Sequence, residues 1–459
     1  MSFSPTSEAA RPSGVRHQVL AFAATLAVIT YVDRVCISQA APAIQKELNL
    51  SATEMGLAFS AFALAYALFE IPGGWLGDWL GPRKVLMRVV LMWSVFTAAT
   101  GYAWNLASLV AARFCFGAGE AGCFPNLTKA FMIWLPAAER TRAQALMWFS
   151  ARWAGAFTPL LVIWVMTWLS WRNSFVLFSA LGVVWAVWFH RSFRDNPREH
   201  PRVNAAELAL IETGAAGSAH EARPPWRKFF RSRSVWLLWA QYFCLAYGWF
   251  FYVTWLPTYL RETRGLQLDQ NALMVWLERV LGEHFAPDLT RRILVATLAG
   301  IPLFCGAFGN VVAAGLTPRL TRALGSTAVA RKALALVGFS GASLLLLGSS
   351  FVRDPLFAML AMGLASFCND LTMPGSWSTC MDVGGKCVGT LSGSMNMMSG
   401  IGSAAAPFVI GVLLDATNRN WSLTFWIAAA VYFLGGLCWL GIDPVTPIVG
   451  EEKDAGGAR

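Results

Sequence analysis

The stretch GGWLGDWLGPRK, residues 73–84, places one aspartate, one arginine and one lysine between two strongly apolar runs, 55–76 and 85–103. A charged group next to apolar runs of this length is stable only where water or an opposite charge receives it. The stretch is therefore predicted to be the turn between two membrane helices, on an aqueous face of the bilayer.

The composition of the whole chain also indicates a membrane protein. Its 459 residues are 56% hydrophobic and only 14% charged, whereas a typical soluble domain is about 25% charged. Apolar runs long enough to cross a hydrocarbon core of ~30 Å occur at 18–40, 55–76, 85–104, 106–134, 143–168, 173–190, 235–260, 293–317, 332–350, 355–380, 388–414 and 421–442. These twelve runs predict an all-α membrane protein.

The distribution of basic residues predicts the orientation of the chain. The net charge is +10, but the basic residues lie in the turns between runs, which argues against nucleic-acid binding. If the N-terminus is cytoplasmic, 23 of the 36 Lys and Arg residues fall on inner segments and nine on outer segments. This asymmetry predicts a multi-pass protein of a cell membrane with both termini cytoplasmic; the composition favours a bacterial inner membrane. A cleaved signal peptide is the alternative, but it would break the charge pattern.

A polar, basic segment, residues 191–234, divides the chain into two halves with six runs each. Its glycine, serine and proline clusters are typical of a linker. We therefore predict an N-terminal six-helix bundle (1–190), a cytoplasmic linker, a C-terminal six-helix bundle (235–445) and a cytoplasmic tail (446–459). Two such bundles are typical of transporters whose binding site lies between them near the bilayer midplane.

The long outer loop, residues 261–292, carries one further helical pattern. Within residues 270–284, apolar side chains recur at i, i+3 and i+4 spacing, as in an amphipathic helix. We expect a helix that lies on the outer membrane surface or, alternatively, packs over the bundle.

The charged turn resembles the signature of the major facilitator superfamily, and its matching residues are Gly74, Asp78, Gly81, Arg83 and Lys84. Other segments are similar to the anion:cation symporter family within that superfamily, which takes up sugar acids and other organic anions. These segments are YVDR at 31–34 followed by Ile37-Ser38, IPGGW at 71–75, RFCFGAGE at 113–120, WLPTY at 255–259 and GTLSGSMN at 389–396.

This resemblance implies the major facilitator fold, with twelve transmembrane helices in two six-helix bundles. It implies that the charged turn is a conformational latch and not a binding site, with Asp78, Arg83 and Lys84 making charge contacts on the inner side. The second half has Pro318 in place of the corresponding aspartate, so it lacks the same carboxylate.

Ionisable side chains within the runs are functional candidates, because each costs at least about 2.5–3.5 kcal/mol to insert. Arg113 and Glu120 are two helical turns apart and share one helix face. The resemblance assigns Glu120 to proton coupling and Arg113 to the substrate carboxylate; an ion pair within one helix is the alternative. Asp33 is likewise assigned as a second protonation site and Arg34 as a substrate contact, and a charged pair near the end of the first run is the alternative.

The resemblance places further substrate contacts on three runs, at Tyr66, Ser376, Trp377, Ser378 and Asn396. Their polar groups would bind substrate hydroxyls while Trp377 packs on the carbon face. Ordinary helix packing is the alternative for these residues.

Four additional charges within the runs are possible cavity charges: Glu70, Lys129, Arg152 and Asp370. Glu70 stands where the resemblance has a glutamine. Asp370 is expected to pair with Lys129 or Arg152. The added positive charge suits a dianionic substrate or neutralises Glu70 and Asp370.

Together these features predict a secondary active transporter for proton-coupled uptake of an organic anion, with sugar acids of the galactonate, glucarate or hexuronate type as expected substrates. The alternatives are an uncoupled facilitator or exchanger of aromatic or other carboxylates, and a transporter-like membrane sensor. No phosphate loop, HExxH motif or nucleophile elbow is present, so no enzyme is predicted. We predict no cofactor and no metal site, since the nine cysteines lack metal-ligand spacing. The expected partners are the anion, protons and the lipid bilayer. The protein itself is expected to be a monomer.

Overall fold

The computed structural model describes residues 11–50, 52–212, 225–254, 272–283, 287–352, 355–417 and 420–448. The described residues form helices joined by turns, without a strand. The first half contains α1 (Arg16–Leu48), α2 (Ala52–Leu80), α3 (Pro82–Gly101), α4 (Leu106–Glu120), α5 (Cys123–Trp134), α6 (Ala137–Met166) and α7 (Trp171–Ser192). The linker contains η1 (Pro197–Glu199), α8 (Ala205–Glu212) and α9 (Trp226–Arg231). The second half contains α10 (Arg233–Thr254), α12 (Ala272–Gly282), α13 (Pro287–Leu324), α14 (Thr327–Ser349), α15 (Pro355–Asp370), α16 (Met373–Gly384), η3 (Gly385–Cys387), α17 (Val388–Ala416) and α18 (Trp421–Gly441).

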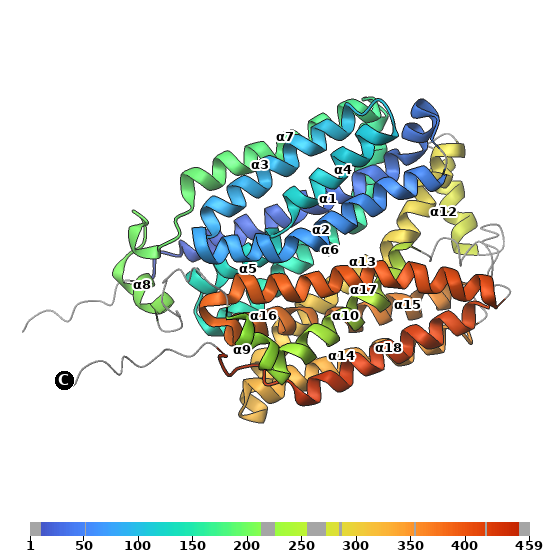
Figure 1. Ribbon diagram of the computed structural model, residues 1–459. Coiled ribbons are helices and arrows are strands. Elements are labelled where there is room, and N and C mark those ends of the chain that lie inside the picture. The colour runs from blue at the N-terminus through green and yellow to red at the C-terminus, as the bar shows by residue number, and fades with distance from the viewer. Residues whose placement is uncertain are drawn as a thin grey trace, which may run out of the picture.

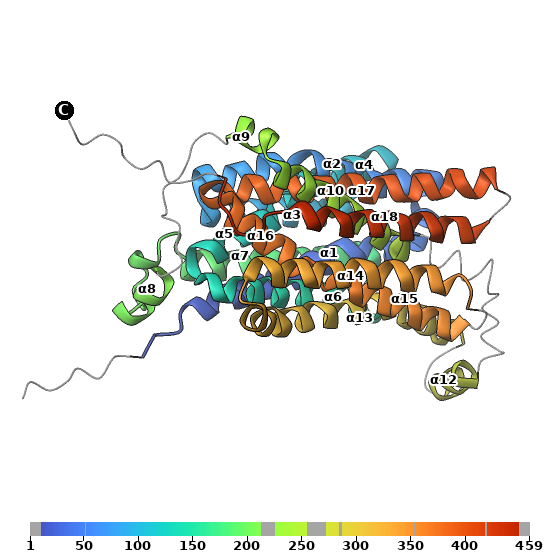
Figure 2. The same ribbon diagram turned by 90° about the horizontal axis from the view of Figure 1, so that it is seen from below.

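The long helices run side by side as two bundles, one from each half (Figures 1 and 2). The halves meet where α2 packs along α17 and α6 packs along α13. Eight helices in the described part of the chain are long and apolar enough to cross a membrane: α1, α2, α3, α6, α7, α13, α14 and α18. With α10, α17 and two interrupted spans, they form the predicted twelve-span fold. The exact boundaries of the two bundles remain predictions.

The fourth span is broken near its middle, which corrects the prediction of one continuous run over 106–134. It divides into α4 and α5 because Gly122 has a φ of 84°, a left-handed conformation that favours glycine. Gly122 also packs directly on α2, where a β-carbon added to it would lie 2.7 Å from the Gly73 Cα. A larger residue could satisfy neither condition.

The tenth span, predicted as a continuous run to residue 380, is broken in the same way. It divides into α15 and α16, with Pro374 in the first turn of α16, a position that needs no backbone N–H. In both broken spans the first segment ends on a carboxylate, Glu120 in α4 and Asp370 in α15.

The helix expected within residues 270–284 is α12, which lies at the end of the bundles opposite to α8 (Figure 1). Its Trp276 side chain is largely exposed. A position on the outer membrane surface remains a prediction. The WLPTY segment at 255–259 lies outside the described residues.

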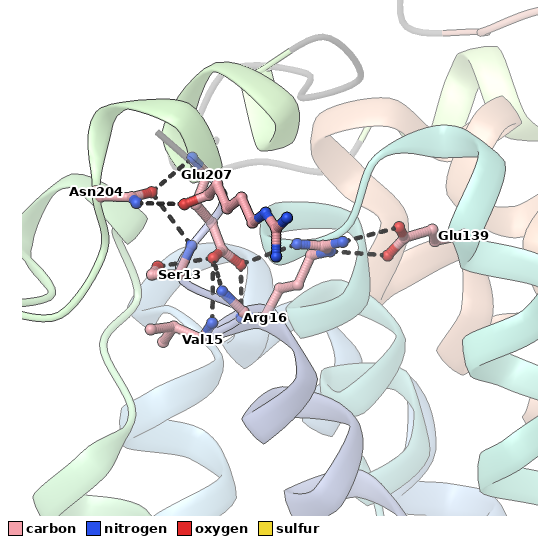
Figure 3. A network of polar contacts seen from close by, with 8 residues as sticks. Ser13, Val15, Arg16, Glu139, Asn204 and Glu207 are labelled. Atoms are coloured by element: carbon pink, nitrogen blue, oxygen red, sulfur yellow. Dashed lines mark hydrogen bonds and ion pairs between the residues drawn. The ribbon is translucent and has the colours of Figure 1, made fainter. Parts of the chain in front are cut away.

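A single carboxylate of the linker caps the N-terminus of α1. Glu207 of α8 accepts hydrogen bonds from three consecutive backbone N–H groups and one hydroxyl, those of Gly14, Val15, Arg16 and Ser13. Helix α1 has no side-chain cap of its own, so Glu207 supplies the acceptor that its first N–H groups need. Figure 3 shows Arg16 between Glu207 and Glu139 of α6, with 3.0 Å from Arg16 Nε to the Glu139 carboxylate.

Replacing Glu207 with glutamine is expected to destabilise this end of the protein. Burial raises the pKa of Glu207, but hydrogen bonds from Ser13, Arg16 and Gly14 outweigh burial and hold the pKa below its ordinary value of 4.5. The carboxylate therefore stabilises the fold above pH 4.5, and this stabilisation is lost as the pH falls through the folded-state pKa. At pH 7 we expect Glu207→Gln to lower the apparent melting temperature by about 2–4 °C. A difference from the wild type that is the same at pH 7 and pH 3.5 would show that the charge has no such role.

Candidate substrate and proton site

The break after α4 places Glu120 against Arg34 of α1. Arg34 Nε donates to Glu120 Oε1 at 2.5 Å; the carboxylate is fully buried, whereas 22% of the Arg34 side chain is exposed. The guanidinium lies 4.5 Å from the ring centroid of Tyr66, and its Nη2 has no hydrogen-bond partner. Arg34 thus keeps part of its side chain exposed, as a group that binds an anion must, and its unpaired Nη2 lies in the buried part.

Arg113 does not form the ion pair within α4 that its spacing allowed, because Glu120 is paired with Arg34. Arg113 is 2% exposed, and its guanidinium lies 4.4 Å from the ring centroid of Phe116. Asp33 is also buried, and neither of its carboxylate oxygens has a hydrogen-bond partner. It interacts electrostatically with Glu120 and Arg113. Arg34 therefore forms an ion pair with the last residue of α4, whereas Asp33 interacts with α4 electrostatically. Of Arg34 and Arg113, only Arg34 has exposed surface that an anion could reach in this conformation.

A hydrogen-bonded group joins α17 to α2 beside Arg34. The Asn396 amide donates to the Tyr66 hydroxyl at 3.0 Å and to Glu70 Oε1 at 2.9 Å. Glu70 Oε2 in turn accepts from the Gly122 N–H at 3.4 Å. Because Tyr66 also lies under Arg34, a connected set of side chains reaches from the second half to the arginine. The structure thus brings Tyr66 and Asn396 together, with Glu70 as an additional carboxylate.

Trp377 of α16 reaches across to the first half. Its Nε1 donates to the Tyr242 hydroxyl at 2.6 Å, and its ring centroid lies 5.5 Å from that of Trp148 on α6. The hydroxyls of Ser376 and Ser378 donate to carbonyls one turn earlier in their own helix, at 3.1 and 2.7 Å. Both serines are fully buried. Trp377 is therefore linked to the surroundings of Arg34 through Trp148, whose ring stacks on Phe124, and Phe124 lies 5.6 Å from the Arg34 guanidinium.

The additional positive charges are each neutralised inside the protein. Arg152 Nε lies 2.7 Å from Asp370 Oδ2. Lys129 Nζ lies 2.8 Å from Asp78 Oδ1. Of the two partners considered for Asp370, the structure selects Arg152, and Lys129 neutralises Asp78 instead of Glu70.

Asp78 links the charged turn to the second half. Its carboxylate accepts from the backbone N–H groups of Gly389 at 3.0 Å and Thr390 at 2.7 Å, at the start of α17, where the helix dipole favours an anion. Gly74 packs so closely on α17 that a β-carbon would lie 2.2 Å from the Gly389 carbonyl oxygen. Both contacts require the two halves to be closed on this side.

The other residues of the turn contact the first half or solvent. Gly81 has a φ of 85°, which favours glycine. The Arg83 N–H donates to Asp195 at 2.8 Å, and its guanidinium donates to the His190 carbonyl at 2.7 Å. Lys84 is exposed. These residues shape the turn, and the contact across the halves is made by Asp78 and its neighbours in α17.

A second contact joins the two halves, and the sequence did not predict it. Asp382 of α16 lies 3.3 Å from the Arg140 guanidinium of α6 and 2.8 Å from the Arg331 guanidinium of α14. Asp382 lies on α16, whereas Pro318, which stands in place of the aspartate expected in the second half, lies on α13. The only signal of Asp382 in the sequence is its place near the predicted inner end of the tenth run.

Two helical bundles packed against one another are typical of membrane transporters. Residues 23–407 match the family model of the Major Facilitator Superfamily, and the chain belongs to this family. It is 35% identical over 446 residues to the probable sulfoacetate transporter SauU of Cupriavidus necator, covering 97% of each chain. It is 28% identical to a D-galactonate transporter of Escherichia coli, covering 98% of this chain and 99% of that protein. It is 30% identical to the probable galactarate/D-glucarate transporter GarP of Escherichia coli, covering 95% of each.

Solved structures show the same fold. The human organic anion transporter MFSD10 (TETRAN) matches with a TM-score of 0.66 and 13% identity, over 92% of this chain and 99% of that chain. The proton:xylose symporter XylE matches with a TM-score of 0.67 and 13% identity, over 95% and 98%. The resemblance to organic-anion transporters of this superfamily, which are not enzymes, is thereby confirmed.

Proposed function

We propose that this protein takes up a small organic anion together with protons by alternating access. The names of its relatives support this substrate class, since they include transporters of sulfoacetate, galactonate and galactarate or glucarate. The sugar acids expected from the sequence stay on the substrate list, and the relative at 35% identity adds a short sulfonated acid. The observation that carries the proposal is the ion pair between Arg34 and Glu120.

The substrate anion and Glu120 compete for the same guanidinium. When a substrate carboxylate or sulfonate binds Arg34, Glu120 loses its counter-charge in a position with no exposed surface. Desolvation penalises the charged form of a carboxylate, and loss of a neighbouring arginine removes what favoured it. Glu120 therefore takes up a proton as the anion binds. Anion and proton then cross together, and Asp33 is the second proton carrier.

The contact between Asp78 and α17 acts as the latch of this cycle. It holds the linker side closed while the site loads from the opposite side. Rocking of the halves breaks its hydrogen bonds to Gly389 and Thr390 and opens the linker side for release. The ion pairs of the partly exposed Asp382 with Arg140 on α6 and Arg331 on α14 act with it.

Uptake into proteoliposomes under an imposed pH gradient tests the proposal. With the interior alkaline, we expect accumulation of sulfoacetate, D-galactonate or D-glucarate by about tenfold per pH unit for one coupled proton. For the monoanion D-galactonate, a second proton on Asp33 would move one net positive charge and add a response of ~2.3 kcal/mol per 100 mV of membrane potential. For the dianions sulfoacetate and D-glucarate, a second proton would make transport electroneutral and remove the response to potential that a single proton leaves. Equilibration without accumulation, at any pH gradient, would indicate an uncoupled facilitator instead. Binding without any uptake would indicate a sensor.

A further inference from the structure

The pair of Arg152 and Asp370 differs from the other buried ion pair of the site, because it joins the two halves. Arg152 lies on α6 and Asp370 ends α15. Arg152 Nε and Nη2 donate to the two carboxylate oxygens at 2.7 and 3.0 Å, and the side chains are 3% and 0% exposed. A bidentate pair in this setting is strong while it is closed and must open when α6 and α15 separate.

The position of Asp370 repeats that of Glu120. Each ends the first segment of the broken fourth span of its half, and each is fully buried against one arginine. Our proposed function treats the arginine of the first pair, Arg34, as the group exchanged between carboxylate and substrate. The same arrangement in the second half points to the same exchange at Arg152.

Asp370 has hydrogen-bond donors other than Arg152. Its Oδ1 also accepts from the Asn369 amide at 2.8 Å, and its Oδ2 from the Asn310 amide at 3.2 Å. Both oxygens therefore keep a donor when Arg152 moves. The two amides occupy lone pairs that the bidentate arginine leaves open, so the carboxylate stays partly satisfied without Arg152.

Arg152 lies near the groups that surround Arg34. The ring of Tyr31 lies 5.7 Å from the Arg34 guanidinium and interacts electrostatically with Arg152. Tyr31 also packs on α6 one turn from Arg152, where a β-carbon on Gly155 would lie 2.9 Å from its ring. Tyr31 thus interacts with both arginines, and the Arg152 guanidinium lies 4.1 Å from the ring centroid of Trp249.

We propose that Arg152 determines substrate charge by binding the second anionic group of a dianionic organic acid whose first anionic group binds Arg34. Asp370 holds Arg152 in the empty carrier and releases it to the substrate. The inference rests on the proposed function, since it assumes that Arg34 binds an organic anion. A monoanion binds Arg34 alone and does not use Arg152.

The test compares acids that differ in one charge. Affinities of the full-length protein in detergent are measured by titration calorimetry for galactarate against galactonate, and for sulfoacetate against methylsulfonylacetate. The main variant combines Arg152→Gln with Asp370→Asn, which removes both charges at similar volume and leaves no unpaired buried ion. We expect it to bind the dianion about 10- to 100-fold more weakly, with the monoanion changed less than about threefold.

Two single variants sharpen the result. Arg152→Lys keeps a positive charge and is expected to retain part of the preference for the dianion. Asp370→Asn removes the internal competitor and is expected to bind the dianion more tightly than the wild type does.

Four outcomes would overturn the inference. Equal weakening of monoanion and dianion in the double variant would show a structural pair, and unchanged affinity for the dianion would show that Arg152 does not bind it. A wild type that takes up only the monoanion of each pair would refute the inference while the proposed function stands. A wild type that takes up none of the four acids would refute the proposed function as well.

Discussion

Glu120→Gln is expected to abolish accumulation of the organic anion against its gradient while exchange of labelled for unlabelled anion continues. The amide keeps the shape of the side chain but cannot take up a proton. It also no longer competes as an anion for Arg34, so substrate binding should be at least as tight as in the wild type. Accumulation of about tenfold per pH unit should fall to simple equilibration, and the exchange rate should stay within about threefold of the wild-type rate.

Both rates can be measured in the same proteoliposomes. Glu47→Gln is the matched control, because Glu47 is a half-exposed carboxylate that pairs with Arg172 near the far end of α1. This control should accumulate substrate as the wild type does. Gradient-driven accumulation that survives Glu120→Gln would place the proton on another group, with Asp33 and Glu70 as the next candidates.

Arg34→Gln is expected to weaken binding of the anion by about 10- to 100-fold, the effect of losing a charge-assisted hydrogen bond. Its removal also leaves Glu120 buried without its partner, so exchange and accumulation should both be lost. This result differs from that of Glu120→Gln, in which exchange survives. Affinity is measured by titration of the purified protein.

Arg172→Gln serves as the control for Arg34→Gln, because Arg172 forms a partly exposed ion pair away from the site. Arg113→Gln provides a further comparison. In this conformation Arg113 lies against Phe116 and is almost without exposed surface. Unchanged affinity in Arg34→Gln together with lost affinity in Arg113→Gln would reverse the assignment of the two arginines.

The spans and the charged turn could be predicted from the sequence because they depend on properties of single segments. An apolar run must be long enough to cross the bilayer, and a group such as Asp78 must find a partner outside the hydrocarbon. In the structure Asp78 accepts hydrogen bonds from the backbone N–H groups of Gly389 and Thr390. The breaks at Gly122 and before Pro374 were missed, because both segments remain apolar through the break.

The partners of the buried charges could be predicted only in part. Spacing within one helix suggested Arg113 beside Glu120, but a contact between helices, with Arg34, takes the carboxylate. Such contacts depend on how helices are rotated and shifted against one another, and no periodicity within one helix reports that. Charge alone limited the expected ion-pair partners of Asp370 to Lys129 and Arg152. The pairing with Arg152 depends on the packing of α6 beside the second half. Asp382 was missed for the same reason.

The central claim is that a substrate anion replaces Glu120 on Arg34 and that Glu120 then takes up a proton. Proton uptake on binding measures this directly, by titrating the purified protein with substrate at pH 7 in weakly buffered detergent solution. The account predicts uptake of about one proton for each anion bound, and loss of that uptake in Glu120→Gln despite continued binding. Binding without a change in pH in the wild type, or equal proton uptake in the two proteins, would contradict it.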